Sequence, residues 1–281
     1  PDYLFSKSGV QWLQQEVDRG ALDEEAMWLI SSDLTLMKVY DEQIEQFDQL
    51  LAQHAWQDQR VRLLMTLPGV DVTVAEAVLA ALGDISRFAT PEQAASYLGL
   101  VPITRQSAAK CYHGPITKQG NKQARWMLVQ AAQQVARHPG PLGNFFRRLK
   151  RRKNHNVAVV ACARKLVVIA IHMLKNNEPY RYAQPATTET KLRTLRVRAT
   201  GQRRRTGMPK GQKAMAKLPG GSRTVKSLDR IYNEEGLPSR QPLPNGELRM
   251  LEAHDSTDFV DLIASDRVVP RKSRPKKKQT T

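Results

Sequence analysis

The sequence predicts a mainly α-helical protein, built from a helical or coiled-coil region, a compact helical domain with a helix-hairpin-helix, and a basic, partly disordered extension. Two observations carry this prediction. Apolar residues recur at spacings of three and four in most segments before residue 182, where no convincing strand pattern occurs. After residue 190 the composition shifts to Lys and Arg interrupted by Gly and Pro. The predicted domains are residues 1–60, 61–182 and 183–281.

The charge is unevenly divided along the chain and indicates a polyanionic partner. The 281 residues carry a formal net charge of +17, yet residues 1–60 hold four Lys/Arg against twelve Asp/Glu, a balance of −8. The other 221 residues therefore carry +25. Such a division suits an acidic helical part joined to a part that binds nucleic acid. The alternative is a basic protein of ribosomal type, which would also bind nucleic acid.

The first sixty residues predict helices with one acidic face. Residues 3–28 contain two short amphipathic pieces, and one long helix is expected from Leu29 to about Ala55. Its apolar residues recur every three or four positions, with acidic residues between them: Leu36, Tyr40, Ile44, Phe47 and Leu51. This stripe fits half of an antiparallel hairpin or an oligomerising coiled coil. An ordinary bundle helix fits equally well.

Residues 62–84 read as helix, tight Pro-Gly turn and helix, which is the plan of a helix-hairpin-helix. In such units the amides of the turn and of the following helix N-terminus bind a DNA phosphate. Asp71 stands where phosphate-binding versions carry a second glycine, and its carboxylate would repel phosphate. We therefore favour a structural hairpin here and keep DNA contact as the alternative.

More helices are expected before residue 182. Thr90 suits the N-cap of a short helix, and residues 121–138 form an amphipathic helix whose apolar positions are Trp126, Leu128, Val129 and Val135. A basic helix, residues 144–154, is followed by an apolar one, residues 157–174. The basic helix should bury Phe145, Phe146 and Leu149 and turn its cations mostly outward, to phosphates: Arg147, Arg148, Lys150, Arg151, Arg152 and Lys153.

A loop is expected between residues 99 and 121, and it has an unusual composition. It places one hydroxyl, Ser107, among cations and contains no carboxylate. The cations that we expect to contact nucleic acid are Arg105, Lys110, Lys118 and Lys122. Glycines at 99, 114 and 120 would allow a close approach of the backbone to a ligand.

The last hundred residues differ in kind. Residues 191–217 hold ten Lys/Arg and no acid, and their Gly and Pro break any helix, as in an arm that orders on RNA or DNA. The run Arg203, Arg204 and Arg205 is the densest cationic point of this arm. Residues 225–266 are more balanced and predict two or three short helices.

Several classes of site are disfavoured by spacing. Cys111 and His113 are two residues apart, but Cys162 and His172 belong to a different, apolar helix, so no closed zinc site is expected. No G-x-S-x-G nucleophile elbow precedes a hydrolase-type serine. No apolar run reaches the ~18 residues of a membrane helix without interruption, since Arg164 and Lys165 divide the longest one.

Several blocks of sequence resemble the C-terminal domain of a bacterial transposase family. The blocks are RVRLLMTLPGVDVTVAEAVLAALGDISRFATPEQAASYLGLVP, then QSAAK, GPITKQGNKQARWMLVQAA and ARKLVVIAIHMLKNNEPYRYAQP. Their order and spacing resemble the IS110 insertion-sequence family with its IS1111 branch, over about residues 3–200. Members of that family are DNA recombinases that pair an N-terminal RuvC-like domain with this helical domain.

The resemblance implies a function and a site. Ser107 would occupy the nucleophile position and attack a DNA phosphodiester, giving a 5′-phosphoserine and a free 3′-OH. Mg²⁺ would be held by an Asp-Glu-Asp-Asp site on the RuvC-like domain, so none is expected in this chain. The implied partners are two DNA duplexes, a structured guide RNA and further copies of the chain, in the bacterial cytoplasm at the nucleoid and away from membranes.

Two departures from the family pattern matter. Ala108 and Ala109 follow Ser107 where the family commonly has glycine, so a stiffer loop is expected. No RuvC-like segment precedes these blocks, and the sequence begins with Pro1, so we expect a fragment that binds nucleic acid and oligomerises but does not cut by itself. The alternative is a non-catalytic nucleic-acid-binding relic of such a transposase.

Overall fold

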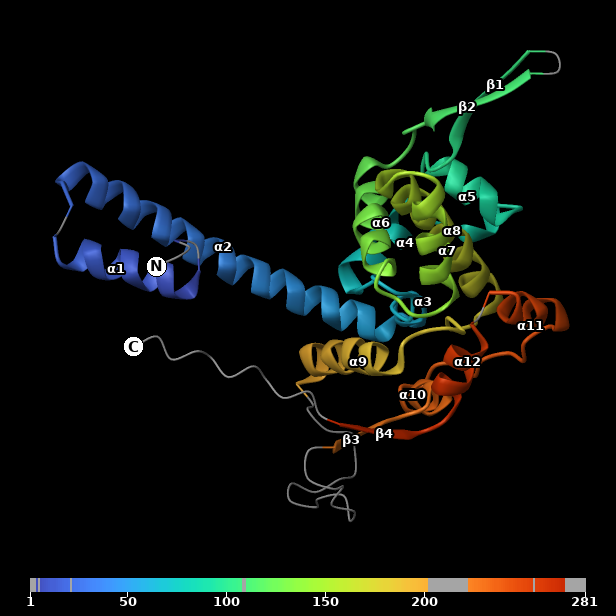
Figure 1. Cartoon of the computed structure of the whole chain (residues 1–281). Coiled ribbons are helices and arrows are strands. Elements are labelled where there is room, and N and C mark those ends of the chain that lie inside the picture. Colours follow the sequence, from blue (N-terminus) through green and yellow to red (C-terminus); the bar gives the residue numbers. More distant parts are fainter. Residues whose placement is uncertain are drawn as a thin grey trace. The chain divides into compact units, whose positions relative to one another are not determined.

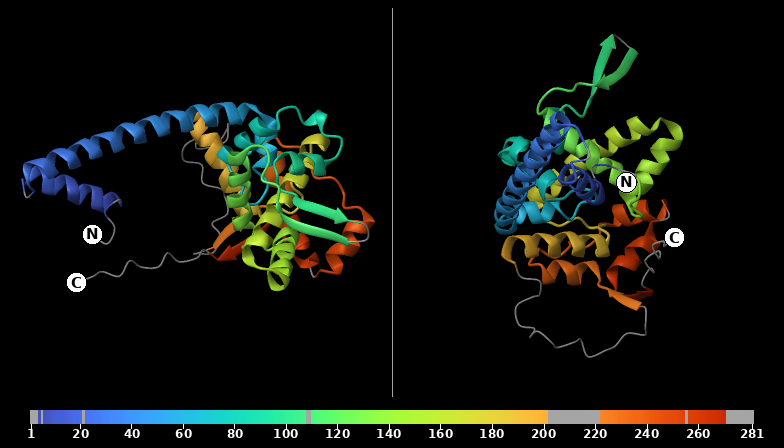
Figure 2. Two further views of the ribbon diagram at one scale, coloured as in Figure 1. Left: turned by 90° about the horizontal axis from the view of Figure 1, so that it is seen from above. Right: turned by 90° about the vertical axis from the view of Figure 1, so that its left-hand side faces the viewer.

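The computed structural model describes residues 4, 6–20, 22–107, 110–201, 222–254 and 256–270. It divides into two compact units, Pro1–Leu51 and Ala52–Thr281 (Figures 1 and 2). Helices account for most of the described elements, which confirms the mainly α-helical fold class. The predicted domain boundaries at residues 60 and 182 stay predictions.

The first unit contains α1 (Lys7–Asp18) and most of α2 (Glu24–Gln57). Ser6 caps α1 by accepting a hydrogen bond from the Gly9 amide at 3.1 Å. The first amphipathic piece is α1, whereas the second merges into the start of the long acidic helix. Much of the predicted apolar stripe on α2 is exposed, with Leu36, Tyr40, Ile44 and Phe47 at 50% to 67% of their maximum. Within this chain, therefore, the stripe is not a core.

The core of the second unit surrounds α8 (His155–Asn176), which packs against several other helices: α3 (Gln59–Leu64), α5 (Pro91–Tyr97), α6 (Lys122–Val135) and α7 (Pro141–Arg152). Leu166, Val167 and Ile171 of α8 are fully buried. Among the described helices, α8 has the length and apolar composition of a membrane span, but half of its apolar window is buried inside the unit. That burial is typical of a core helix.

The Pro-Gly turn joins α3 to α4 (Val72–Leu82), as expected, and its polar groups serve the fold. Asp71 is the N-cap of α4 and accepts a hydrogen bond from the Val74 amide at 3.0 Å. Gly69 has φ +77°, and a Cβ there would lie 2.2 Å from the Ala131 carbonyl oxygen of α6. The glycine therefore lets α6 pack against the turn. Phosphate binding by this turn stays a prediction.

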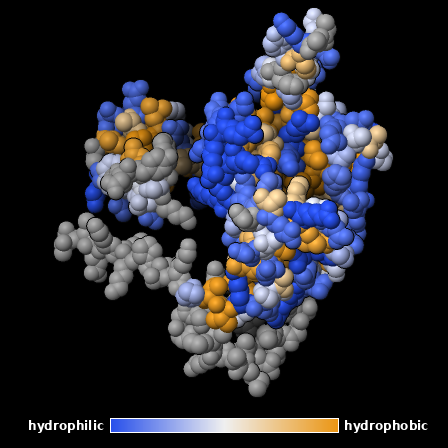
Figure 3. All heavy atoms as spheres, turned by 45° about the vertical axis from the view of Figure 1, so that its right-hand side comes forward, coloured by the Kyte–Doolittle hydropathy of each residue, from blue (hydrophilic) through white to orange (hydrophobic). Residues whose placement is uncertain are grey.

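The predicted loop around Ser107 is a β-hairpin, so the expectation of no strand before residue 182 was wrong. After the 3-10 turn η1 (Ile85–Arg87) and α5, strand β1 (Pro102–Ser107) pairs antiparallel with β2 (Lys110–Ile116). We call residues 102–116 the serine hairpin. Figure 1 shows it extending away from the helices, and Figure 3 shows it as a separate projection. With no face on a core, its strands lack the apolar alternation that identifies strands in sequence.

The C-terminal part continues the helical fold. Helix α9 (Pro185–Thr200) buries Leu192 and Leu195 in the core, so the prediction of a helix-free arm is wrong for residues 191–200. Three short helices follow, as predicted: α10 (Leu228–Glu234), α11 (Asn245–Glu252) and α12 (Thr257–Ala264). Strands β3 (Ser222–Val225) and β4 (Arg267–Pro270) pair beside them.

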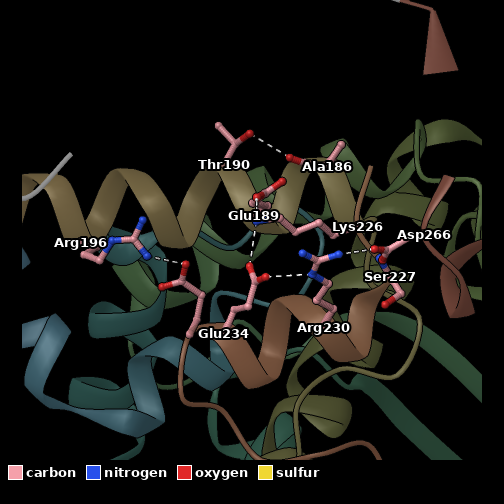
Figure 4. A network of polar contacts seen from close by, with 10 residues as sticks. Ala186, Glu189, Thr190, Arg196, Lys226, Ser227, Arg230, Glu234 and Asp266 are labelled. Carbon is pink, nitrogen blue, oxygen red and sulfur yellow. Dashed lines mark hydrogen bonds and ion pairs between the residues drawn. The ribbon is translucent and has the colours of Figure 1, made fainter. Parts of the chain in front are cut away.

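Ion pairs bind α9 to α10 (Figure 4). Lys226 Nζ lies 2.7 Å from Glu189 Oε1 of α9 and 2.8 Å from Glu234 Oε2 of α10. Arg196 of α9 pairs with Glu235 at 2.6 Å, and both side chains are largely buried. Removing one partner of the buried Arg196–Glu235 pair would leave the other charge buried without compensation. This pair therefore favours the packing of α10 against α9.

Candidate nucleic-acid interface

The root of the serine hairpin is held by backbone contacts that require glycine. Gly99 and Gly120 have φ +68° and +78°, and a Cβ on Gly120 would lie 2.0 Å from the Tyr97 carbonyl oxygen. The Thr117 amide donates to the Val101 carbonyl at 2.9 Å. At these two positions, the close approach expected of the glycines is between two segments of this chain.

Arg125 of α6, which the sequence analysis did not single out, reinforces this root. Its Nη1 donates to the carbonyl oxygens of Leu98 at 3.1 Å and Gln119 at 2.9 Å, one on each side of the hairpin. The hairpin thus leaves the helices from a fixed base. The sequence signal was weak, because an arginine four residues after an Asn N-cap looks like any surface cation.

The strand register places Ser107 and two cations on one face of the hairpin. Ser107 lies opposite Lys110, and Arg105 lies opposite Tyr112. Directly opposed residues share a face, as do residues two apart in a strand, so these four belong to one face. All four are exposed, and Ser107 ends β1 at the far end of the hairpin. Gln106 and Cys111 form the next pair and lie on the other face.

The electrostatics of this face are purely cationic. The hairpin segment contains no Asp or Glu, so no carboxylate of its own competes for Arg105 or Lys110. Exposed cations on an exposed strand attract phosphate. The free-energy cost of removing water from them is small when a phosphate binds, because the contact itself is charge-assisted. Tyr112, which sequence reasoning missed, adds an exposed aromatic ring to the same face. Its signal was the alternation with Lys110 in a segment then interpreted as a loop.

Lys118 and Lys122 lie at the root and not near Ser107. Lys118 has the left-handed φ of +57°, and Lys122 is the first residue of α6; both are exposed. Five residue steps separate Pro102 from Ser107, which is about 17 Å of strand. A phosphate held at Lys118 is therefore not the phosphate in contact with Ser107. Arg105 and Lys110 beside Ser107, and Lys118 and Lys122 at the root, therefore suit different phosphates of one nucleic-acid strand.

The basic helix α7 presents most of its predicted cations to solvent: Arg148, Lys150, Arg151 and Arg152 are exposed, as is Lys153 at its C-cap. Arg147 differs, because it is half-buried and its Nη1 donates to the His138 carbonyl oxygen at 3.0 Å. Its other contacts are Asn144 and the Ala136 carbonyl oxygen. Arg147 therefore stabilises the bend between α6 and α7, and the expectation that it points outward was wrong.

One further expectation has a definite outcome, and others lie outside the part of the chain that the structure describes. Trp126, expected at an apolar position of its helix, is 58% exposed, whereas Leu128 and Val135 of the same helix are buried. Arg203, Arg204 and Arg205 lie outside the described residues, as do Ala108 and Ala109. Their roles stay predictions.

Comparison with known proteins gives the interface a context. Residues 61–147 match the model of the transposase IS116/IS110/IS902 family, a segment that contains the whole serine hairpin and most of α7. The chain is 30% identical over 145 residues to the transposase for insertion sequence element IS1111A of Coxiella burnetii, which is 50% of this chain and 40% of that protein.

Two other relatives extend the comparison. An uncharacterized 44.8 kDa protein of insertion element IS116 from Streptomyces clavuligerus is 28% identical over 52% of this chain and 37% of its own length. A pilin gene-inverting protein of Moraxella bovis is 31% identical over 43% of this chain and 38% of its own length. The matched part thus spans well under half of each of these relatives.

Proposed function

Because residues 61–147 carry the domain shared by transposases of the IS116/IS110/IS902 family, we propose that this chain is the nucleophile-carrying and nucleic-acid-binding part of a DNA recombinase. The names of its relatives describe transposition and the inversion of a gene segment, both of which rearrange DNA. The observation that carries the proposal is the position of Ser107, exposed at the end of a rigidly rooted hairpin on one face with Arg105 and Lys110.

The chemistry that suits this face is transesterification at phosphorus. Ser107 Oγ forms a bond to the phosphorus of a DNA phosphodiester and gives up its proton, while the bond from phosphorus to the 3′-oxygen breaks. The products are a 5′-phosphoserine and a 3′-oxygen that takes up a proton. Arg105 and Lys110 would neutralise the charge that gathers on the non-bridging oxygens, which a carboxylate neighbour would oppose. Attack by another 3′-OH would reverse the step and exchange strands.

We propose that the Mg²⁺ ligands do not come from the described residues of this chain. No group of three His, Cys, Asp or Glu among them lies close enough to hold a metal ion. A RuvC-like partner domain would have to supply the ligands and would, when loaded, polarise the reacting phosphate. The steps assigned to this chain are therefore binding, positioning and nucleophilic attack.

The proposed partners are donor and target DNA, a structured guide RNA and a second copy of the chain. The cations of the serine hairpin and α7 support binding to a phosphate backbone. The exposed apolar stripe of α2 supports self-association, because a helix that leaves such a stripe open is typical of a coiled-coil half.

The experiment that tests this function traps the covalent intermediate. The chain is combined with a RuvC-like domain, guide RNA, Mg²⁺ and a DNA target labelled on the strand end that a phosphoserine would retain, and the reaction is stopped with denaturant. A protease-sensitive protein–DNA adduct is expected with Ser107 and with Gln106→Ala, whose side chain lies on the other face, and not with Ser107→Ala. If all three proteins bind DNA equally and none forms an adduct, the recombinase hypothesis is wrong and the chain is a non-catalytic nucleic-acid-binding protein.

A further inference from the structure

A large pocket lies on the second unit, away from the serine hairpin. Its volume is about 680 Å³, and its walls come from α7, α8, residues 178–182 and α11. This size falls in the range of about 300–1,000 Å³ typical of sites for small organic ligands. Neither the family resemblance nor the matched segment assigns it a role, and its wall on α11 lies beyond the matched residues.

The lining of the pocket includes apolar side chains and a cation held against one of them. Phe145, Ile169 and Met250 line it, and Met250 is 58% exposed although it is apolar. Lys165 Nζ lies 4.7 Å from the centre of the Phe145 ring, in a cation–π contact. The ring thus holds the ammonium at the wall without neutralising its charge.

The pocket as a whole keeps a positive excess. Its two carboxylates already have partners: Arg181 contacts Glu178 at 2.5 Å and Glu247 at 2.7 Å, and Tyr182 donates to Glu247 at 2.6 Å. Arg148, Arg151 and Lys165 form no ion pair with any carboxylate of the described residues. A ligand with an anionic group and a flat apolar group would match both the cations and the wall.

We propose that this pocket binds one phosphorylated nucleoside unit, an unpaired nucleotide of a single strand, with its base against Phe145, Ile169 and Met250 and its phosphate on Arg151 and Lys165. Bases bind well to apolar and aromatic walls whatever their sequence, and charge-assisted contacts fix the phosphate. The inference rests on the proposed nucleic-acid binding and deepens it, because it separates a base-accepting site from the backbone contacts of the serine hairpin.

The basic helix supports this choice of ligand. Lys150, Arg151 and Arg152 are all exposed on α7, but of these three only Arg151 lines the pocket. One helix thus offers cations both to the pocket and to the surface beside it. A single strand that runs along α7 can contact Lys150 and Arg152 through its phosphates and insert one base into the pocket.

The test uses photo-crosslinking on the full 281-residue chain. Short single strands of DNA or RNA carry one 5-iodouracil and a fluorescent label, and mass spectrometry locates the crosslinked residue while fluorescence anisotropy measures total binding. Crosslinks are expected at Phe145, at Met250 or at His172 of α8, which also lines the pocket. Excess uridine monophosphate is added in a parallel reaction. If the crosslink yield falls, a free nucleotide also binds in the pocket; if the yield is unchanged, the bound unit comes from the strand.

Matched variants separate the pocket from the surface. Arg151→Gln with Lys165→Gln should lower the crosslink yield about tenfold, because two phosphate contacts are lost. Lys150→Gln with Arg152→Gln removes the same charge from the same helix and should lower total binding in the anisotropy measurement, while the crosslinks that remain still fall on the residues of the pocket. Met250→Ala, at an exposed position, keeps every charge but removes an apolar contact of the base, so it should lower the crosslink yield at Phe145 and His172.

The outcomes distinguish this inference from the proposed function. Crosslinks only outside the pocket, with strong total binding, overturn the inference and leave nucleic-acid binding in place. Crosslink yields at Phe145 and His172 that are unchanged in Met250→Ala also overturn it. A chain that binds no DNA or RNA in the anisotropy arm overturns both.

Discussion

Lys191 of α9 links the Pro-Gly turn to the core, and its burial makes stability depend on pH. Its Nζ donates to the carbonyl oxygens of Leu67 at 2.7 Å and Val70 at 2.8 Å. Burial lowers the pKa of Lys191 to about 7. A neutral amine still has two N–H donors, so both hydrogen bonds persist after the proton is lost.

The sign of the pH effect follows from proton counts. The unfolded chain keeps Lys191 protonated up to about pH 10.4, whereas the folded chain releases the proton near pH 7. Between these values the unfolded state binds more protons, so the free energy of unfolding rises with pH. Integrated from pH 6 to pH 9, the rise from this one group is about 2–3 kcal/mol.

The assay compares the pH dependence of two proteins. Denaturant unfolding of the wild type and of Lys191→Met is measured at several values from pH 6 to pH 9. Lys191→Met should lack the rise from this group, so the wild type's stability relative to the variant grows by about 2–3 kcal/mol as pH rises. Other groups titrate in both proteins and cancel in this difference.

Lys175→Met is the matched control, because exposed Lys175 also donates to two carbonyl oxygens, those of Phe88 and Ala89. This variant loses the same kind of contact as Lys191→Met, so it reports what the loss of two such hydrogen bonds costs. A constant difference between the wild type and Lys191→Met over this range would refute the buried, neutralising lysine.

Three other outcomes are expected. Gly120→Ala should destabilise the hairpin root by roughly 2 kcal/mol or more, because φ is +78° and the added Cβ meets a carbonyl, whereas Gly114→Ala, whose nearest contact is 3.6 Å, should change thermal stability little. Arg105→Gln should lower the slope of log affinity against log salt by about 0.9 for duplex DNA, while Gln106→Ala leaves that slope unchanged. Phe47→Glu on the exposed stripe of α2 should shift sedimentation towards the monomer; an unchanged distribution would argue against pairing through this face.

Most of the helices before residue 182 could be predicted because they bury a periodic apolar face or begin with a recognisable cap. Asn121 and Asn154, for example, cap α6 and α8 through their side-chain oxygens. Burial also explains the failure at residues 191–200, since the abundance of cations hid the core positions Leu192 and Leu195. Composition alone could not distinguish a basic helix packed on one side from a solvated arm.

The sequence predicts a chemistry for the candidate site, but it does not predict the geometry of that site. The sequence itself shows one serine among cations with no acid nearby, which indicates phosphate chemistry. It does not show that Ser107, Arg105 and Lys110 share one face while Lys118 lies at the root, because that depends on the strand register. A hairpin exposed on both faces leaves no apolar period from which that register can be inferred.

The sequence by itself thus determined the helical class and the division of charge, since these follow from local periodicity and composition, whereas Ser107 as the nucleophile was implied by the family resemblance and stays a prediction. Tertiary structure decided which cations are available. It turned Arg147 inward to backbone carbonyls, neutralised the carboxylates of the pocket through Arg181, and left Arg151 and Lys165 without such partners among the described residues. The physical reason is that the groups packed beside a charged side chain decide whether it pairs within the protein or stays available to a ligand. Those groups come from segments distant in the chain.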